Sequence, residues 1–194
     1  MSMSRSVRAR PLSLRLAVGA IAVSVAVAAC GNTSKSKQSS ADKLLQQGLT
    51  AQGAGNLDQA RQDYLGVLKL DPTNKFAYYD LGVIAQQLGD ANGAADNYHK
   101  ALNVDANYKP AMFNLAVLET PIAPQTAISL YRQLLALNPN DANVHLNLGF
   151  VLKQVGQTAD GDAELAAAVR INPAMASRLP PASTTVPAPT TTRR

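Results

Sequence analysis

The chain has 194 residues, 46% of them hydrophobic, and a net charge of +5 from 18 basic and 13 acidic side chains. Four arginines lie before the single cysteine, Cys30, which leaves 14 basic and 13 acidic side chains in the rest of the chain. That near balance excludes a strongly basic face for nucleic acid, and one cysteine excludes an internal disulfide.

The first thirty residues have the pattern of an export signal. A positively charged start without acidic residues is followed by residues 16–29, where only Gly19 and Ser24 are not aliphatic. This run is shorter than the about 20 apolar residues of a membrane-spanning helix. Val27-Ala28-Ala29-Cys30 then resembles the bacterial lipobox. The resemblance implies that residues 1–29 are a lipoprotein signal peptide, removed when Cys30 is acylated with palmitate-like chains. The mature protein would then be anchored by lipid on the extracytoplasmic face of a bacterial cell membrane.

Two other fates of this segment stay open. Ala26-Val27-Ala28 also fits the A-x-A cleavage pattern, which would release a secreted soluble protein with a free thiol. An uncleaved anchor is the third possibility. Residue 31 is glycine, not the aspartate that marks retention at the cytoplasmic membrane in some bacteria, so the sequence does not choose between the cytoplasmic and the outer membrane.

Polar segments flank the part of the chain that is expected to fold. Residues 31–40 (GNTSKSKQSS) contain no apolar side chain. With Cys30 they predict a lipidated cysteine and flexible tether over 30–40, reaching roughly 17 Å. Residues 180–194 (PPASTTVPAPTTTRR) are rich in proline and threonine and predict a disordered tail, with or without O-glycosylation. The folded part should therefore span 41–179.

Within this part the sequence repeats itself. Tyr64, Tyr98, Tyr131 and Leu165 are spaced 34, 33 and 34 residues apart, and a small residue precedes each of them by four. Related stretches (LKLDP, LNVDA, LALNP, VRINP) close the units. This pattern resembles the tetratricopeptide repeat. The resemblance implies an all-α, right-handed superhelical solenoid of four helix-turn-helix repeats (41–74, 75–108, 109–141 and 142–175) with a short cap to residue 179.

Small residues in the repeats, and positions that depart from the repeat pattern, predict local features of the fold. The first helices should approach their neighbours closely at four small residues: Gly48, Gly82, Ala116 and Gly149. In repeat two Ala106 replaces the closing proline, so that junction should depend on packing and on Asp105. Repeat three is one residue short and contains ETPIAPQTA. Thr120 in this stretch precedes a proline and is biased out of helical geometry, so the first helix should end near Glu119. This connection is either a tolerated loop or a rigid lip beside a binding surface.

Catalytic and metal-binding patterns are not found in the sequence. His99 and His145 have no ligand partner at metal-binding spacing, and the acidic group at 160–164 lies where a helix is expected to begin. There is no phosphate-binding glycine loop and no nucleophile motif. The sequence therefore predicts no enzyme, no cofactor and no metal.

The family resemblance implies instead a concave groove, lined by the first helices, that binds a peptide or an amphipathic helix. Its positions correspond to Leu45, Leu49, Gln52, Phe76, Tyr79, Val83, Gln86, Gln87, Phe113, Val117, Asn143, Leu146, Phe150, Lys153 and Gln154. Lys153 is the only cation in this set, which favours an apolar ligand over a captured terminal carboxylate. Tyr79, Phe113 and Phe150 should project toward one surface. Occupation of the groove by the cap or the tail is the alternative.

The predicted function is a membrane-anchored extracytoplasmic scaffold or adaptor that binds a protein of the cell envelope. A narrower alternative resembles the repeat lipoproteins that assist pilus, secretin or outer-membrane assembly. A small-ligand carrier or enzyme and a passive spacer are the remaining classes. The identity of the partner, the pathway, the oligomeric state and the modification of the tail do not follow from the sequence.

Overall fold

The computed structural model describes the backbone of residues 19–179 and the side chains of residues 35–179. In this part of the chain all regular structure is helical, which confirms the predicted all-α class. The chain divides into two compact units with a boundary after Pro72, described separately below. The start of the predicted signal, the side chain of Cys30 and the predicted tail lie outside the described residues.

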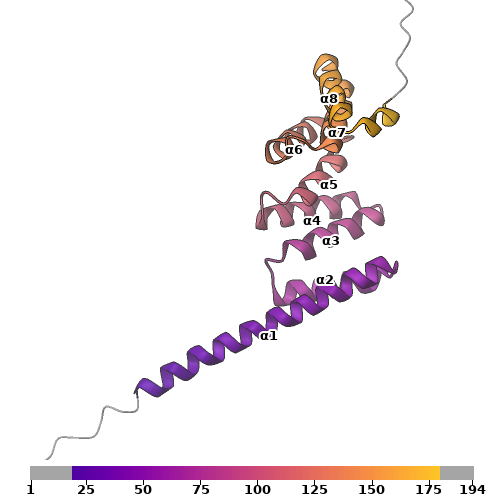
Figure 1. Ribbon diagram of the computed structural model, residues 1–194. Coiled ribbons are helices and arrows are strands. Elements are labelled where there is room, and N and C mark those ends of the chain that lie inside the picture. Colours follow the sequence, from indigo (N-terminus) through magenta and orange to yellow (C-terminus); the bar gives the residue numbers. More distant parts are fainter. Residues whose placement is uncertain (1–18, 180–194) are drawn as a thin grey trace, which may run out of the picture. The chain divides into compact units, whose positions relative to one another are not determined.

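The first unit is a pair of helices, α1 (Gly19–Gly53) and α2 (Leu57–Leu70), lying side by side (Figure 1). Gly55 makes the turn between them with φ of +79°, a left-handed conformation that glycine adopts without steric cost. A methyl group added at Gly48 would lie 2.6 Å from the Tyr64 ring. The missing side chain therefore allows the close approach that the repeat pattern predicts.

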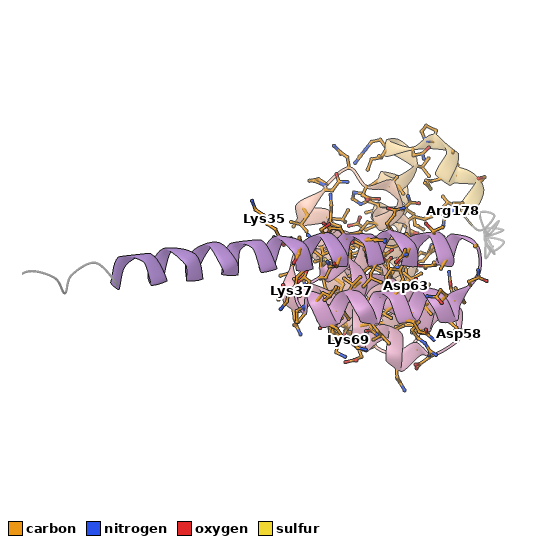
Figure 2. All side chains as sticks on the ribbon, turned by 90° about the horizontal axis from the view of Figure 1, so that it is seen from below. Lys35, Lys37, Asp58, Asp63, Lys69 and Arg178 are labelled. Atoms are coloured by element: carbon orange, nitrogen blue, oxygen red, sulfur yellow. The ribbon has the colours of Figure 1, made fainter. Side chains whose placement is uncertain are left out.

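Helix α1 extends well beyond the end of α2, and Lys35 and Lys37 lie near the point where the two part (Figure 2). Residues 31–40, expected to form a flexible tether, belong to this helix. Ser40 Oγ donates to the Ser36 carbonyl at 2.9 Å. The predicted flexible tether rested only on the lack of apolar residues in this segment. The segment also lacks proline and continues directly into the first repeat, so each added residue extends an existing helix without a new nucleus.

Within residues 73–179, the second unit contains three helix pairs and a short 3₁₀-helix at the end (Figure 1). Each of the second, third and fourth predicted repeats contains one pair. The elements are α3 (Lys75–Gln87) and α4 (Ala91–Val104), α5 (Lys109–Glu119) and α6 (Pro124–Leu137), α7 (Ala142–Gln154) and α8 (Thr158–Ile171), and η1 (Pro173–Arg178).

Short polar side chains begin three of these helices. Asn74, Asp90 and Asp141 each accept hydrogen bonds from backbone N–H groups in the first turn of α3, α4 and α7, at 2.9 to 3.3 Å. These side chains satisfy donors that have no partner inside the helix, and such a cap contributes about 1 kcal/mol. Asn74 and Asp141, which follow closing motifs, thus fix where the second and fourth repeats start, and Asp90 fixes the start of the second helix of repeat two.

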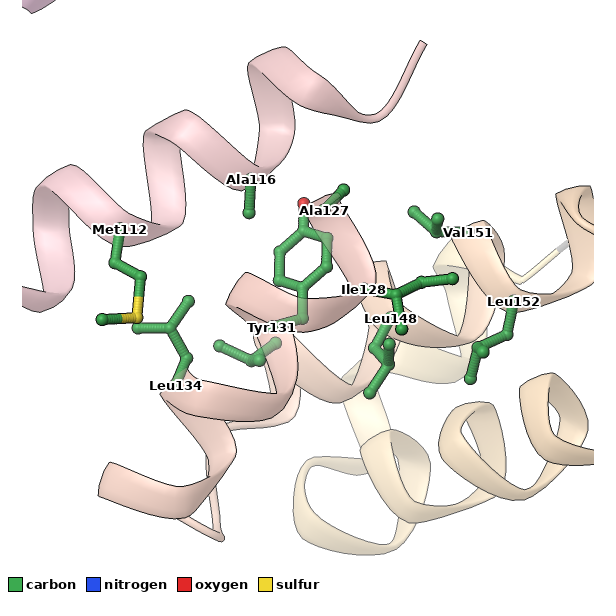
Figure 3. Close-up of a cluster of buried hydrophobic side chains, with 10 residues drawn as sticks. Met112, Ala116, Ala127, Ile128, Tyr131, Leu134, Leu148, Val151 and Leu152 are labelled. Atoms are coloured by element: carbon green, nitrogen blue, oxygen red, sulfur yellow. The ribbon is translucent and has the colours of Figure 1, made fainter. Parts of the chain in front are cut away.

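Small residues face large ones between the helices of each pair. A methyl group would lie 2.5 Å from the Tyr98 ring if added at Gly82, and 2.7 Å from a side chain of α8 if added at Gly149. Between α5 and α6, Tyr131 is 1% exposed and points toward Ala116 in a cluster that α7 completes (Figure 3). The close approach predicted for these positions is confirmed. The tyrosines at 64, 98 and 131 are core residues.

Repeat three has the irregular turn that its prolines predict. Helix α5 ends at Glu119 as expected, and Thr120 Oγ1 donates to the Ala116 carbonyl at 2.9 Å. Helix α6 begins at Pro124, whose missing N–H costs nothing at the first helical position. Residues 120–123 do not line the hollows described below. The connection therefore fits a tolerated loop better than a lip beside a site.

An ion pair supports the junction that lacks a proline. Asp105 accepts from Lys75 Nζ at 2.5 Å and from the Asn107 backbone N–H at 3.0 Å. These hydrogen bonds, chiefly the one from Lys75, lower the pKa of Asp105. The same ammonium lies 5.1 Å from the centre of the Tyr108 ring. Asp105 and local packing thus hold this junction, as the sequence suggests.

Candidate binding surface

Two neighbouring hollows open on the second unit. The cap-side hollow, of about 590 Å³, is formed by α5, the start of α7 and η1, and the inner hollow, of about 340 Å³, by α3, α5, α6 and the start of α7. The cap-side hollow is lined by Phe113, Val117, Asp141, Asn143, Asn147 and Arg178. The inner hollow is lined by Tyr79, Lys109, Pro110, Phe113, Asn114, Leu134, Asn138, Asp141 and Val144. Because Phe113 and Asp141 line both, the two hollows adjoin each other.

An apolar floor runs through this surface. The half-buried Phe113 ring packs edge-on against Tyr131, with the ring centres 6.1 Å apart. One turn further along α5, Val117 is 38% exposed. Phe113 is thus held by the core on one side and borders the hollows on the other. A partner could cover the Val117 side chain without changing the core.

A polar network fixes the wall of the inner hollow. Asn114 Nδ2 donates to the hydroxyls of Tyr79 and Tyr98, each at 3.3 Å, and the Tyr98 hydroxyl donates to Gln86 Oε1 at 2.7 Å. Burial raises the pKa of Tyr98 to about 12, so its hydroxyl stays protonated at neutral pH. Tyr98 and Gln86 thus help to hold Asn114 and Tyr79 in place before any ligand arrives.

The charged side chains of the hollows are two cations and one carboxylate. Arg178 Nη1 donates to Asn143 Oδ1 at 3.0 Å, and no ion pair within the described residues involves Arg178 or Lys109. The carboxylate belongs to Asp141, which caps α7. The electrostatic field in the hollows is therefore not neutralised by the residues that line them.

Asp80 is an unusual acidic residue on α3. It takes the position in its repeat that Asn114 and Asn147 take in the next two. Burial raises the pKa of the half-buried Asp80 carboxyl to about 6. A carboxylate thus stands where the other repeats have a neutral amide, at a cost in desolvation.

The first unit has a hollow of a different character. It has a volume of about 450 Å³ and lies between α1 and α2. Apart from two alanines its lining is polar or charged: Lys43, Gln46, Gln47, Thr50, Asn56, Gln59 and Asp63. Asp63, 9% exposed, accepts from Gln59 Nε2 at 2.9 Å. Most of its lining side chains end in polar groups, whereas Phe113 and Val117 line the hollows of the second unit.

The predicted groove residues have different surroundings in the structure. Those that line the two hollows are Tyr79, Phe113, Val117 and Asn143. Leu49 and Phe76 are exposed, Leu45 and Val83 are half-buried, and Gln52, Gln86 and Lys153 bind Tyr64, Tyr98 and Asp162 respectively. Gln87 and Gln154 are exposed. Leu45, Leu49 and Gln52 belong to the first unit.

The structure corrects the prediction for Leu146. This side chain is completely buried in a cluster with Met175 of η1, and Phe150 packs partly buried against the same cluster. Leu146 is therefore a core residue. Phe150 does not line the hollows beside Tyr79 and Phe113. The short cap covers the last repeat, a role that the sequence suggested for residues 174–179.

Nine of the thirteen residues that line the hollows are absent from the predicted set, among them every charged one. Arg178 lies beyond the last repeat, so no repeat position pointed to it. Asn114 and Asn147 match an asparagine common in the repeat, and that match was the available signal. Lys109 and Asp141 lie where α5 and α7 begin, outside the groove positions.

The described residues contain neither a candidate metal site nor a candidate membrane-spanning helix. No group of three or more histidine, cysteine and acidic side chains is placed to hold a metal. His145 contacts Glu164 Oε2 at 2.5 Å and the Pro139 carbonyl at 2.9 Å, so both of its ring nitrogens are used inside the repeat. None of the described helices combines the length and hydropathy needed to cross a bilayer.

Family profiles match three segments of the chain. A profile described as tetratricopeptide repeat matches residues 44–74 and 77–108, and one described as TPR repeat matches residues 125–156. The segments cover the end of α1 with α2, most of the pair α3–α4, and α6 with α7. The chain is a tetratricopeptide repeat protein. No curated protein shows significant sequence similarity to it.

Solved structures of other tetratricopeptide repeat proteins share the fold. MamA is 19% identical with a TM-score of 0.65, over 84% of this chain and 99% of that one. PilF of Pseudomonas aeruginosa is 24% identical with a TM-score of 0.62, over 71% and 64%. YrrB, described as having an unusual peptide-binding site, is 20% identical with a TM-score of 0.66, over 76% of both chains. At these identities the likeness concerns the fold, a scaffold for protein interactions.

Proposed function

We propose that this tetratricopeptide repeat protein is a lipid-anchored adaptor on the extracytoplasmic face of a bacterial membrane. It binds a peptide or helix of an envelope protein on the second unit. The observation that carries the proposal is the pair of hollows that share Phe113, with Val117 exposed beside it. An apolar floor with fixed amide groups at its edge suits a protein segment, which presents apolar side chains and backbone groups together.

The anchor is supported by the sequence around Cys30. A charged start, a short aliphatic run and the VAAC tetrapeptide occur in the order that a lipoprotein signal requires. After cleavage before Cys30, α1 would begin at the lipidated residue, and its residues 30–40 would span about 16 Å as a helix. The repeats would then stand away from the lipid surface on a helix.

The binding proposal can be tested by photocrosslinking in cells. A photoreactive amino acid at Val117 should capture a reproducible envelope protein. The control is Val104 at the end of α4, which is 40% exposed against 38% for Val117 and lines neither hollow. Equal capture from both positions, or none from Val117, would count against a binding surface here.

The anchor needs its own test. The wild-type protein should incorporate a labelled palmitate analogue and remain with washed membranes, whereas Cys30→Ser should do neither. A Cys30→Ser protein that still sediments with membranes after washing would contradict the lipid anchor. The crosslinking result would stand in either case.

A role in assembling an envelope machine is a second candidate, and the likeness to PilF favours it only through the shared fold. Co-purification of pilus, secretin or outer-membrane assembly components with the crosslinked protein would support it. A passive spacer is the opposing possibility, and it predicts no reproducible crosslink at Val117.

A further inference from the structure

Two cations border the hollows of the second unit without an acidic partner. The ion pairs of this unit use Lys75, Lys100, Lys153 and His145, and none of the described ion pairs includes Lys109 or Arg178. Both cations are exposed, and each forms part of the lining of a hollow. A ligand lying in the hollows would therefore meet positive charge at two places.

The carboxylate in the lining does not cancel this charge. Asp141 Oδ1 already accepts from the backbone N–H groups of Asn143 and Val144 at the start of α7. The positive end of the helix dipole lies at the same place and offsets part of the negative charge. A basic ligand would meet a single carboxylate that is already hydrogen-bonded, and two cations that repel it.

The two cations lie in different hollows. Arg178 lines only the cap-side hollow and Lys109 only the inner one, while Phe113 lines both. They are therefore not arranged to clamp a single terminal carboxylate. They suit acidic side chains on either side of an apolar side chain that covers Phe113.

We propose that the hollows bind an internal acidic and apolar segment of the partner protein. An aliphatic or aromatic side chain packs on Phe113 and Val117, and neighbouring Asp or Glu side chains pair with Arg178 or Lys109. Asn147 also lines the cap-side hollow and can bond to the peptide backbone of the segment, as can the amide nitrogen of Asn143, whose oxygen accepts from Arg178. The inference deepens the proposed function, because it names the chemistry of the segment that the adaptor recognises.

The test uses random eight-residue segments displayed inside a carrier protein, so that no free terminus is present. Selection on the full-length protein should enrich segments with Asp or Glu next to a large apolar residue. The double variant Lys109→Gln/Arg178→Gln should lose the acidic preference and keep the apolar one. Arg132→Gln is the matched control, because Arg132 is an exposed cation of α6 that lines neither hollow.

Binding constants then give the size of the effect. Replacing the acidic residues of an enriched segment by Asn or Gln should weaken binding about threefold or more per charge at low salt, and added salt should reduce the difference. Circular dichroism should be the same for all variants, because both cations are exposed. Enrichment of neutral or basic segments, or acidic enrichment that survives in the double variant, would overturn the inference.

The outcomes separate this inference from the proposed function. Neutral segments that bind through Phe113 and Val117 would leave the adaptor function intact and refute only the acidic preference. Failure to enrich any segment, together with no crosslink from Val117, would refute both.

Discussion

Phe113 and Leu146 occupy the same position in successive repeats but have opposite surroundings. Phe113 lines two hollows, whereas Leu146 is completely buried beneath the terminal cap. The position in the repeat fixes the side of the helix from which a residue projects. Whether that side stays open depends on what packs against it: η1, which follows α8, buries Leu146 of α7 against Met175.

The first helices also differ between the two units. In α5 and α7, two residues four positions apart near the start of the helix are apolar and buried. They are Ala111 and Leu115 in α5, and Val144 and Leu148 in α7. The corresponding residues of α1 are Lys43 and Gln47, which line the polar hollow of the first unit. A polar outer face is what a terminal repeat needs for solubility. Repeats with the same helix-turn-helix backbone can thus be internal or terminal, depending on whether this face of the first helix is apolar or polar.

The largest loss of stability is expected at Leu146, the position that the cap covers. Leu146→Ala removes a fully buried side chain and should lower the free energy of unfolding by about 2–5 kcal/mol. Val117→Ala is the control at an open position, and it should cost less than about 1 kcal/mol. Chemical denaturation of both variants measures the difference. A loss of equal size at both positions would mean that the cap does not bury Leu146.

The cap itself provides the next test. A chain ending at Asn172 lacks η1, so Leu146 loses its contact with Met175. Its melting temperature should fall by about 2–4 °C for each kcal/mol lost. A chain ending at Leu179 keeps η1, and its thermal unfolding should be nearly unchanged. If the second truncation also lowers the melting temperature strongly, residues 180–194 contribute to the fold.

Particular residues show how far the sequence could predict this structure. The four helix pairs followed from the spacing of Tyr64, Tyr98, Tyr131 and Leu165, because a core position must recur with the repeat. The helical continuation through residues 31–40 did not follow, since composition alone does not report helix propagation from a neighbouring segment. Nine of the thirteen residues that line the candidate surface were also missed. The repeat pattern gave Phe113 and Val117, but Arg178 enters from outside the repeats.

A smaller effect is expected where the helices of a pair approach each other. Gly82→Ala places a methyl group 2.5 Å from the Tyr98 ring, which is fully buried and has little room to move. Overpacking of this kind should cost about 1–3 kcal/mol. Gly53→Ala is the control, because nothing lies within 4 Å of the added group. That change should be neutral or slightly stabilising in a melting experiment. Equal melting temperatures for the two variants would disprove the tight contact.

The smallest effect concerns Asp80, the acidic exception to the asparagines of repeats three and four. Burial raises the pKa of Asp80 from 3.8 to about 6, so the folded chain holds a proton that the unfolded chain has released. The associated stability is complete below about pH 3.8 and is lost as the pH rises through about 6. Asp80→Asn removes this dependence. The variant should therefore match the wild type at pH 3.5 and exceed it at pH 7.5.

The size of this gain follows from the shift. Two pKa units correspond to about 3 kcal/mol at most, and partial solvent screening of a half-buried group reduces the expected gain to about 1 kcal/mol. Denaturant unfolding of both proteins between pH 3.5 and 7.5 measures it. Asp96→Asn is the control, because its side chain on α4 is 62% exposed and pairs with Lys100 at the surface. If Asp80→Asn is less stable than the wild type at pH 7.5, the ionised carboxylate has a favourable partner in the folded protein, and its burial is not the dominant influence on its pKa.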